Sequence, residues 1–145
     1  MKLSVVIPAY NEEATLQAAL EEVASVLEGL GLAYEVIVVD DGSTDGSWAL
    51  LQRLGSQDAW RQRLRAVRFS RNFGKEAAIV AGLQYADGNA VIVMDADLQH
   101  PPAFIPQMVE LWTRGSYMVV EGVKRRRQRE SILRRLSALV FYRVL

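Results

Sequence analysis

The chain lacks several features that would point to common chemistries. It has no cysteine among its 145 residues, which excludes disulfides, thiolate metal sites and a cysteine nucleophile. No stretch approaches the roughly 20 consecutive apolar residues of a membrane-spanning helix. The first turn reads Pro-Ala-Tyr-Asn-Glu over residues 8–12, so the glycine-rich signatures of dinucleotide-binding and P-loop proteins are missing. Phosphate binding, if present, has to use other groups.

Charge is balanced overall but unevenly distributed along the chain. Residues 1–120 contain 9 Lys or Arg and 15 Asp or Glu, a balance of −6, whereas residues 121–145 contain 8 and 2, a balance of +6. We therefore expect a globular domain over residues 1–121 and a basic amphipathic tail over residues 122–145. Such a tail suits an anionic membrane surface or a lipid phosphate. Its arginines are not interleaved with aromatic residues, so we expect no nucleic-acid partner. The alternative is a solvated helix packed on the domain.

Apolar runs alternate with helical patterns along the chain, which predicts an α/β fold with a mostly parallel sheet. Strands are expected over residues 3–7, 34–39, 64–69, 90–94 and 117–120. Helices are expected from about residue 12 to 30, from 44 or 45 to 54, from 75 to 85, and from 101 to 112. Asn11 is the expected N-cap of the first helix.

The most informative segment is Asp95-Ala96-Asp97, directly after the apolar run 90–94, which we interpret as a buried strand. The two carboxylates leave the sheet at its carboxyl edge, where open α/β sheets bind ligands. Mg²⁺ is usually held by one or two carboxylates together with substrate phosphates. The segment therefore predicts a metal-bridged nucleotide diphosphate site, and the carbonyl oxygen of Gln99 could complete the ligands. The alternative is a polar turn.

Polar groups also follow the first and second strands, and parallel strands would bring them to the same edge. Pro8 can fix the first loop, Tyr10 can cover a ring, and Glu12 can accept a hydrogen bond from a base or ribose. Asp41, after the second strand, can accept in the same way. The alternatives are a packed surface aromatic, a first-turn acid on a helix dipole, and ordinary turn chemistry.

A basic loop opens the third predicted helix. Arg71 and Lys75 lie in residues 70–76, and basic groups at a helix N-terminus suit an anion. The alternative is a solvated loop. His100 is the only histidine, and we interpret it as a solvated turn residue.

Four ordered motifs together resemble the family 2 glycosyltransferases of the GT-A fold. More narrowly, they resemble the polyprenyl-phosphate sugar transferases, the dolichol-phosphate mannosyltransferase-like group. The motifs are residues 5–13, 38–46, 70–76 and 95–102. The resemblance implies a Rossmann-like three-layer α/β/α fold, a UDP- or GDP-sugar donor, Mg²⁺ or Mn²⁺, and undecaprenyl or dolichyl phosphate as acceptor.

The resemblance also implies roles for individual residues. The expected nucleotide-sugar-binding residues are Pro8, Ala9, Tyr10, Glu12, Asp41, Asp95, Ala96 and Asp97. The expected metal ligands are Asp95, Asp97 and Gln99, and the expected acceptor-phosphate residues are Lys124 and Arg134. No catalytic residue is identified beyond Asp97, which would act through the metal.

Members of this family continue past the last motif, so we expect this chain to be the N-terminal part of a longer, inverting enzyme at the cytoplasmic face of a membrane. Two alternatives come from other classes. A nucleotidyltransferase would use similar acid–metal geometry, although it usually carries a glycine-rich basic loop after the first strand. A phospho-receiver-like module would also have Asp40-Asp41 and a βα repeat, although its acid pair belongs after the first strand.

Overall fold

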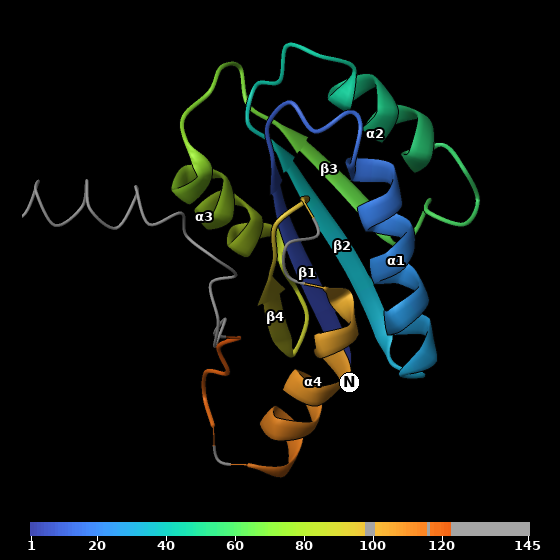
Figure 1. The fold of residues 1–145 in the computed structure, drawn as a ribbon, viewed down its shortest axis with the longest axis vertical. Coiled ribbons are helices and arrows are strands. Elements are labelled where there is room, and N and C mark those ends of the chain that lie inside the picture. The colour runs from blue at the N-terminus through green and yellow to red at the C-terminus, as the bar shows by residue number, and fades with distance from the viewer. Residues whose placement is uncertain (98–100, 116, 123–145) are drawn as a thin grey trace, which may run out of the picture.

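The computed structural model describes residues 1–97, 101–115 and 117–122. Four strands form one parallel sheet in the order β3-β2-β1-β4 (Figure 1). The strands are β1 (Lys2–Ala9), β2 (Ala33–Asp40), β3 (Leu64–Arg68) and β4 (Ala90–Val93). The helices are α1 (Leu16–Gly29), α2 (Ser47–Gly55), α3 (Lys75–Tyr85), the short 3₁₀ helix η1 (Pro102–Phe104) and α4 (Ile105–Arg114). The predicted α/β fold is confirmed.

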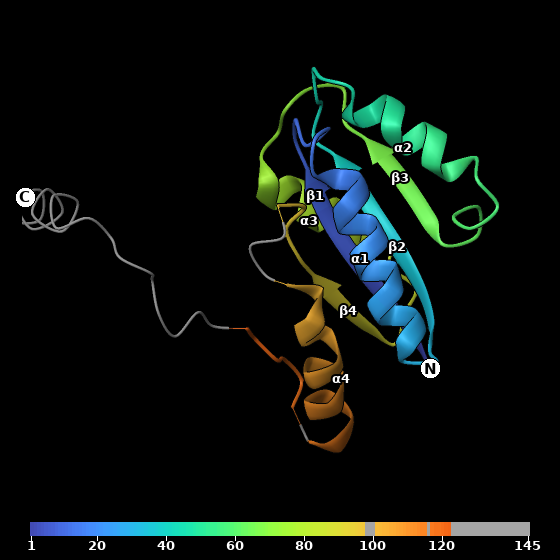
Figure 2. The same cartoon turned by 45° about the vertical axis from the view of Figure 1, so that its right-hand side comes forward.

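Helices cover both faces of the sheet, which gives three layers. The cores on the two faces are separate: Val5 and Ile7 of β1 pack with the apolar sides of α1, α2 and α4, whereas Val6 packs with Ala78 of α3. Figure 2, turned from the view of Figure 1, shows α1, α2 and α4 on one side and α3 on the other. Full burial of such side chains contributes about 1.5–3 kcal/mol each, so the two central strands fix the frame on which the loops sit.

The first helix starts later than predicted, because Asn11 does not cap it. The helix begins at Leu16 after Thr15, and Asn11 has a left-handed φ of 56°. The side-chain oxygen of Asn11 instead accepts a hydrogen bond from the backbone N–H of Thr44 at 2.9 Å. The predicted cap was wrong because a contact 33 residues away uses the same oxygen.

Two other expectations about elements were also wrong. The strand β4 is not buried: it pairs with β1 at the edge of the described sheet, and Val91 and Val93 are 39% and 43% exposed. Residues 117–120 do not form a strand, and Tyr117 and Met118 are 60% and 93% exposed. An apolar run therefore predicted more burial than the structure shows, because no neighbouring element among the described residues covers these segments.

The start of one further helix also differs from the sequence prediction. Helix α2 begins at Ser47 rather than at residue 44 or 45, because the preceding residues belong to a loop. The predicted basic tail from residue 122 onward lies almost entirely outside the described residues. No helix in the described ranges combines the length and apolar character needed to cross a bilayer.

Candidate functional site

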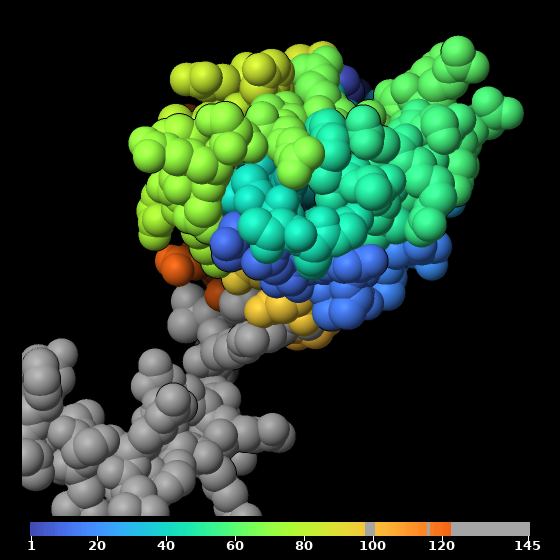
Figure 3. Space-filling view, turned by 90° about the horizontal axis from the view of Figure 1, so that it is seen from above, coloured from blue at the N-terminus to red at the C-terminus, as the bar shows by residue number. Residues whose placement is uncertain are grey.

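The loops that carry the predicted site residues meet at the carboxyl edge of the sheet. Ala9 of β1 is in register with Asp40 of β2, and the N–H of Asp41 donates to the carbonyl of Ala9 at 2.8 Å. The N–H of Met94, just past β4, donates to the carbonyl of Val6 at 3.1 Å. Figure 3 looks down on this edge, where the loops after β1 and β2 and the loop before α3 lie side by side. The prediction that these groups share one edge is confirmed.

The loops after β1 and β2 are joined by reciprocal hydrogen bonds. The N–H of Asn11 donates to the hydroxyl of Ser43 at 2.9 Å, while the N–H of Thr44 donates back to the side-chain oxygen of Asn11. One residue further, the N–H of Glu12 donates to the hydroxyl of Ser47 at 2.9 Å. The two loops therefore form one unit, which holds Glu12 and its neighbours in place before any ligand arrives.

Acidic side chains strengthen the same junction. The N–H of Glu13 donates to one oxygen of Asp45 at 3.1 Å, and the N–H of Ser47 donates to the other at 2.9 Å. Desolvation acts to raise the pKa of Asp45, but the hydrogen bonds from Ser47 and from the Glu13 backbone outweigh it and hold the pKa below its usual value. Asp45 is thus a structural anion of the loops.

The predicted nucleoside residues after β1 differ in what they offer to a ligand. Pro8 and Ala9 are the last residues of β1, and Ala9 is buried. They therefore form the apolar base of the site and offer no polar side chain to a ligand. Tyr10 is 44% exposed, as a ring-covering residue has to be. The carboxylate of Glu12 accepts a hydrogen bond from the hydroxyl of Thr15 at 2.6 Å, which orients it.

The two adjacent acids after β2 have different partners. Asp40 is fully buried and pairs through Oδ2 with Nε of Arg68 at 3.1 Å. Asp41 is also buried, and its two oxygens accept hydrogen bonds from the N–H groups of Phe73 and Gly74 at 2.7 and 2.9 Å. We call this arrangement the Asp41 latch. The sequence predicts Asp41 only as an acceptor for the nucleoside, whereas the structure shows that it also holds the loop before α3.

Gly42 lets this loop approach closely. Its φ is +71°, and a Cβ at this position would lie 2.4 Å from the carbonyl carbon of Arg71. The guanidinium of Arg71 lies over the ring of Phe73, with 4.8 Å between its Cζ and the ring centroid. The Asp41 latch and the Gly42 contact together fix the start of α3.

Lys75, the first residue of α3, contacts the Asp-Ala-Asp segment. Its Nζ lies 2.5 Å from Oδ1 of Asp95, and the two side chains are 53% and 31% exposed. Met94 and Ala96 are buried in the core shared with α1, so they anchor the segment. Asp97 is exposed. The third and fourth motifs of the sequence are therefore in direct contact.

The donor atoms at this edge fit a hard divalent cation. Asp95 and Asp97 supply carboxylate oxygens, the ligands that Mg²⁺ and Mn²⁺ prefer. Within the described ranges, no group of three or more His, Cys, Asp or Glu side chains gathers as a self-sufficient metal site. A pair of carboxylates matches a cation that takes its remaining ligands from substrate phosphates. Gln99, Lys124 and Arg134 lie outside the described residues.

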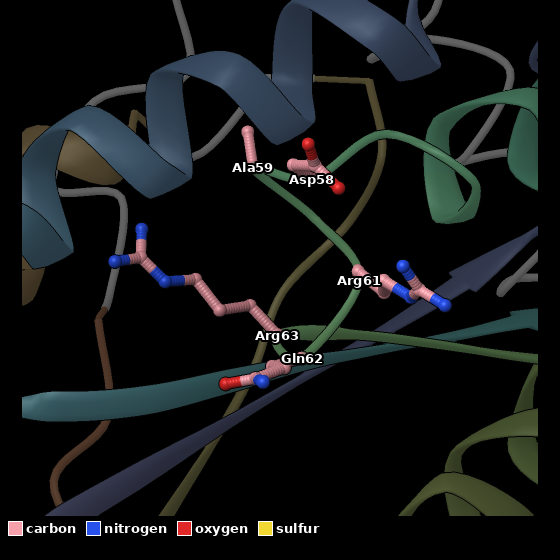
Figure 4. A pocket seen from close by; sticks show the side chains of 5 residues that line it. All are labelled: Asp58, Ala59, Arg61, Gln62 and Arg63. Atoms are coloured by element: carbon pink, nitrogen blue, oxygen red, sulfur yellow. The ribbon is translucent and has the colours of Figure 1, made fainter.

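A surface hollow elsewhere on the molecule contains none of these residues. It has a volume of about 460 Å³ and is lined by Asp58, Ala59, Arg61, Gln62 and Arg63, the segment that leads into β3 at the opposite edge of the sheet. Figure 4 shows the side chains of Arg61 and Arg63 pointing away from one another rather than converging. The hollow is an open dip beside one loop, so the carboxyl edge remains the candidate site.

Comparisons with known proteins identify the family to which the sequence is similar. The sequence matches the model of Glycosyl transferase family 2 over residues 4–143. It is 44% identical over 138 residues to undecaprenyl-phosphate 4-deoxy-4-formamido-L-arabinose transferase of Aeromonas hydrophila, which covers 95% of this chain and 41% of that protein. It is also 44% identical over 145 residues to an uncharacterized glycosyltransferase of Synechocystis sp., which covers 100% of this chain and 44% of that protein.

Two solved structures show the same fold. Mannosyltransferase PcManGT of Pyrobaculum calidifontis, in complex with GDP-Man and Mn²⁺, has a TM-score of 0.62 and 26% identity over 74% of this chain and 31% of its own. Glucosyl-3-phosphoglycerate synthase of Mycobacterium tuberculosis, with Mn²⁺, UDP and phosphoglyceric acid, has a TM-score of 0.63 and 31% identity over 79% and 40%. The chain thus spans less than half the length of these four proteins.

Proposed function

Because the chain belongs to glycosyl transferase family 2, we propose that it is the donor-binding part of an enzyme that transfers a sugar from a UDP- or GDP-sugar to a polyprenyl phosphate. The observation that carries the proposal is the contact of Lys75 with Asp95 at the carboxyl edge, which gathers acidic and basic groups where a nucleotide diphosphate would lie. The family match also favours a glycosyltransferase over the nucleotidyltransferase and the receiver-like module.

On the donor side, the proposal assigns the nucleoside to the loops after β1 and β2. Tyr10 would cover the base, and Glu12 and Asp41 would accept hydrogen bonds from base or ribose, with Pro8 and Ala9 shaping the floor. Asp95, Asp97 and Gln99 would hold Mg²⁺ or Mn²⁺, and Ala96 would line the site between the two acids. A bound divalent cation supplies positive charge against the leaving diphosphate.

On the acceptor side, the proposal assigns the lipid phosphate to Lys124 and Arg134. A phosphate monoester is already ionised near neutral pH, so the step requires no strong base. One of its oxygens forms a bond to the anomeric carbon as the bond from that carbon to the nucleotide diphosphate breaks, and the nucleotide diphosphate leaves. Attack from the opposite face inverts the anomeric centre. The basic residues after 122 would hold the enzyme at the anionic cytoplasmic face of a membrane.

The Asp97→Asn variant tests the donor part of this proposal. We expect the wild-type chain to bind either UDP or GDP more tightly with Mn²⁺ than with EDTA, and we expect the variant to lose this difference. The affinity for the nucleotide in Mn²⁺ should fall about tenfold or more, because mutating even the groups that support metal ligands typically lowers metal affinity by about 10–100-fold. Isothermal titration calorimetry with each nucleotide, in Mn²⁺ and in EDTA, measures it.

Asp58→Asn is the matched control, because Asp58 is an exposed acid at the opposite edge of the sheet. It should bind like the wild type. Equal binding of the wild type in Mn²⁺ and EDTA, or an unchanged Asp97→Asn variant, would contradict the metal-dependent donor site.

A further inference from the structure

The Lys75–Asp95 pair places a protein cation on a carboxylate that is proposed to hold a metal ion. The ammonium lies 2.5 Å from Oδ1 of Asp95, so it stands where a cation on that oxygen would compete with it. Two positive charges near one carboxylate oxygen repel each other by an amount that depends on the local dielectric. Both side chains are partly exposed, so solvent ions can reach the pair.

The backbone at the start of α3 is fixed by several contacts, whereas the ammonium of Lys75 lies at the end of a flexible side chain. The Asp41 latch fixes the backbone N–H groups of Phe73 and Gly74, immediately before Lys75. Gly42 contacts the backbone of Arg71 and Asn72 on the other side of the same loop. A lysine side chain has a flexible four-carbon stem and three rotatable donors. The backbone of Lys75 is therefore fixed beside Asp95 while its charge can swing away.

We propose that Lys75 holds the place of the divalent cation at Asp95 when no donor is bound, and turns to the donor diphosphate when the metal binds. Lys75 is then a positioning residue: it neutralises and orients Asp95 in the free protein. The diphosphate gives the displaced ammonium a new anionic partner. This inference rests on the proposed donor site for the identity of the ligands.

The exchange makes binding of metal and of diphosphate cooperative. A metal ion that arrives alone has to displace Lys75 without giving it another partner, so metal binding alone is weakened. A metal ion that arrives with a nucleotide diphosphate supplies that partner, so the combined binding is favoured. Removing the lysine charge should therefore move the two affinities in opposite directions, which a merely structural role of Lys75 would not do.

The test compares Lys75→Met and Lys75→Gln with the wild-type chain. Mn²⁺ binding alone is followed by electron paramagnetic resonance of free Mn²⁺, and we expect it to tighten roughly two- to fivefold in both variants, the range of an exposed ion pair. Binding of UDP or GDP at saturating Mn²⁺, measured by calorimetry, should weaken about tenfold through the lost charged hydrogen bond. Lys75→Arg should keep the coupling, and Arg61→Met, at the opposite edge, should change neither affinity.

The outcomes separate this inference from the proposed function. Mn²⁺ binding that stays the same or weakens in both folded variants overturns the placeholder role, whatever the nucleotides do. Tighter Mn²⁺ binding with unchanged nucleotide affinity overturns the transfer of Lys75 to the diphosphate. If the wild type binds neither nucleotide, the proposed function fails, while the Mn²⁺ arm still decides whether Lys75 competes for Asp95. Circular dichroism melts confirm that each variant is folded.

Discussion

Gly42→Ala should destabilise the protein through a steric clash with the loop that opens α3. Gly42 has a φ of +71°, and an added Cβ would lie 2.4 Å from the carbonyl carbon of Arg71, 2.7 Å from its Cα and 2.8 Å from the backbone nitrogen of Asn72. All three atoms belong to the backbone, so no side-chain rotation relieves the contact. Either the loop moves away from β2 or the turn at residue 42 changes.

Two costs add up in this variant. A non-glycine residue in the left-handed region costs about 1–2 kcal/mol, and overpacking a well-packed contact costs about 1–3 kcal/mol. The expected loss is therefore about 2–5 kcal/mol, a large fraction of the roughly 5–15 kcal/mol of a typical domain. Gly31→Ala separates the two costs, because Gly31 has a φ of +64° but no atom within 4 Å of its added Cβ.

Urea unfolding followed by far-UV circular dichroism measures both variants. In Gly31→Ala the free energy of unfolding should fall only by the backbone term, about 1–2 kcal/mol. In Gly42→Ala it should fall by about 1–3 kcal/mol more. Equal losses in the two variants, with unchanged dependence on urea, would falsify the claim that the loop before α3 is packed against Gly42.

Two further predictions concern hydrogen-bonded carboxylates. Asp41→Asn should lower the free energy of unfolding by about 1–3 kcal/mol in urea unfolding, because the one amide oxygen cannot replace both carboxylate oxygens and a part-buried N–H of Phe73 or Gly74 loses its partner. Stability equal to that of Asp58→Asn would show that the latch adds nothing. The hydrogen bond from Lys2 lowers the pKa of Asp87 below its ordinary 3.8, so its stabilisation is present above that pH and is lost as pH falls through the lowered pKa. In Asp87→Asn, the urea midpoint should fall less steeply than in the wild type as the pH is lowered from about 5. If the urea midpoint depends on pH equally in the two proteins, the prediction is refuted.

The frame of the fold could be predicted because it depends on local patterns. Alternating apolar strands and amphipathic helices specify a parallel sheet, and α3 begins at Lys75 and ends at Tyr85 as expected. Strand β4 and residues 117–120 were misjudged for a common reason. An apolar β-branched run shows that a segment suits a strand, but its burial depends on which neighbour covers it, and that neighbour is not visible in the run itself.

The location of the candidate site could be predicted, whereas its internal contacts could not. Strand ends in a parallel sheet share an edge, so the acids after β1, β2 and β4 were expected together. The side-chain partners depend on distances between loops far apart in sequence. Asn11 bonds Thr44, and Asp41 bonds backbone N–H groups of Phe73 and Gly74. The residue types alone do not show that these side-chain oxygens accept hydrogen bonds from backbone N–H groups of distant loops.

The relative position of Lys75 and Asp95 follows from one residue of the central strand. The carbonyl of Val6 accepts the hydrogen bond from the N–H of Met94, which places Asp95 one residue further on. On the α3 side, a Cβ added at Gly82 would lie 2.3 Å from Cγ1 of Val6, so only glycine lets α3 sit this close to β1. Val6 therefore positions the segment that carries Asp95 through its carbonyl and contacts α3, which carries Lys75, through its side chain. The Asp41 latch fixes the start of α3. The packing of the sheet therefore fixes the backbones that carry the two partners, while their partly exposed side chains can still exchange the ion pair for a ligand.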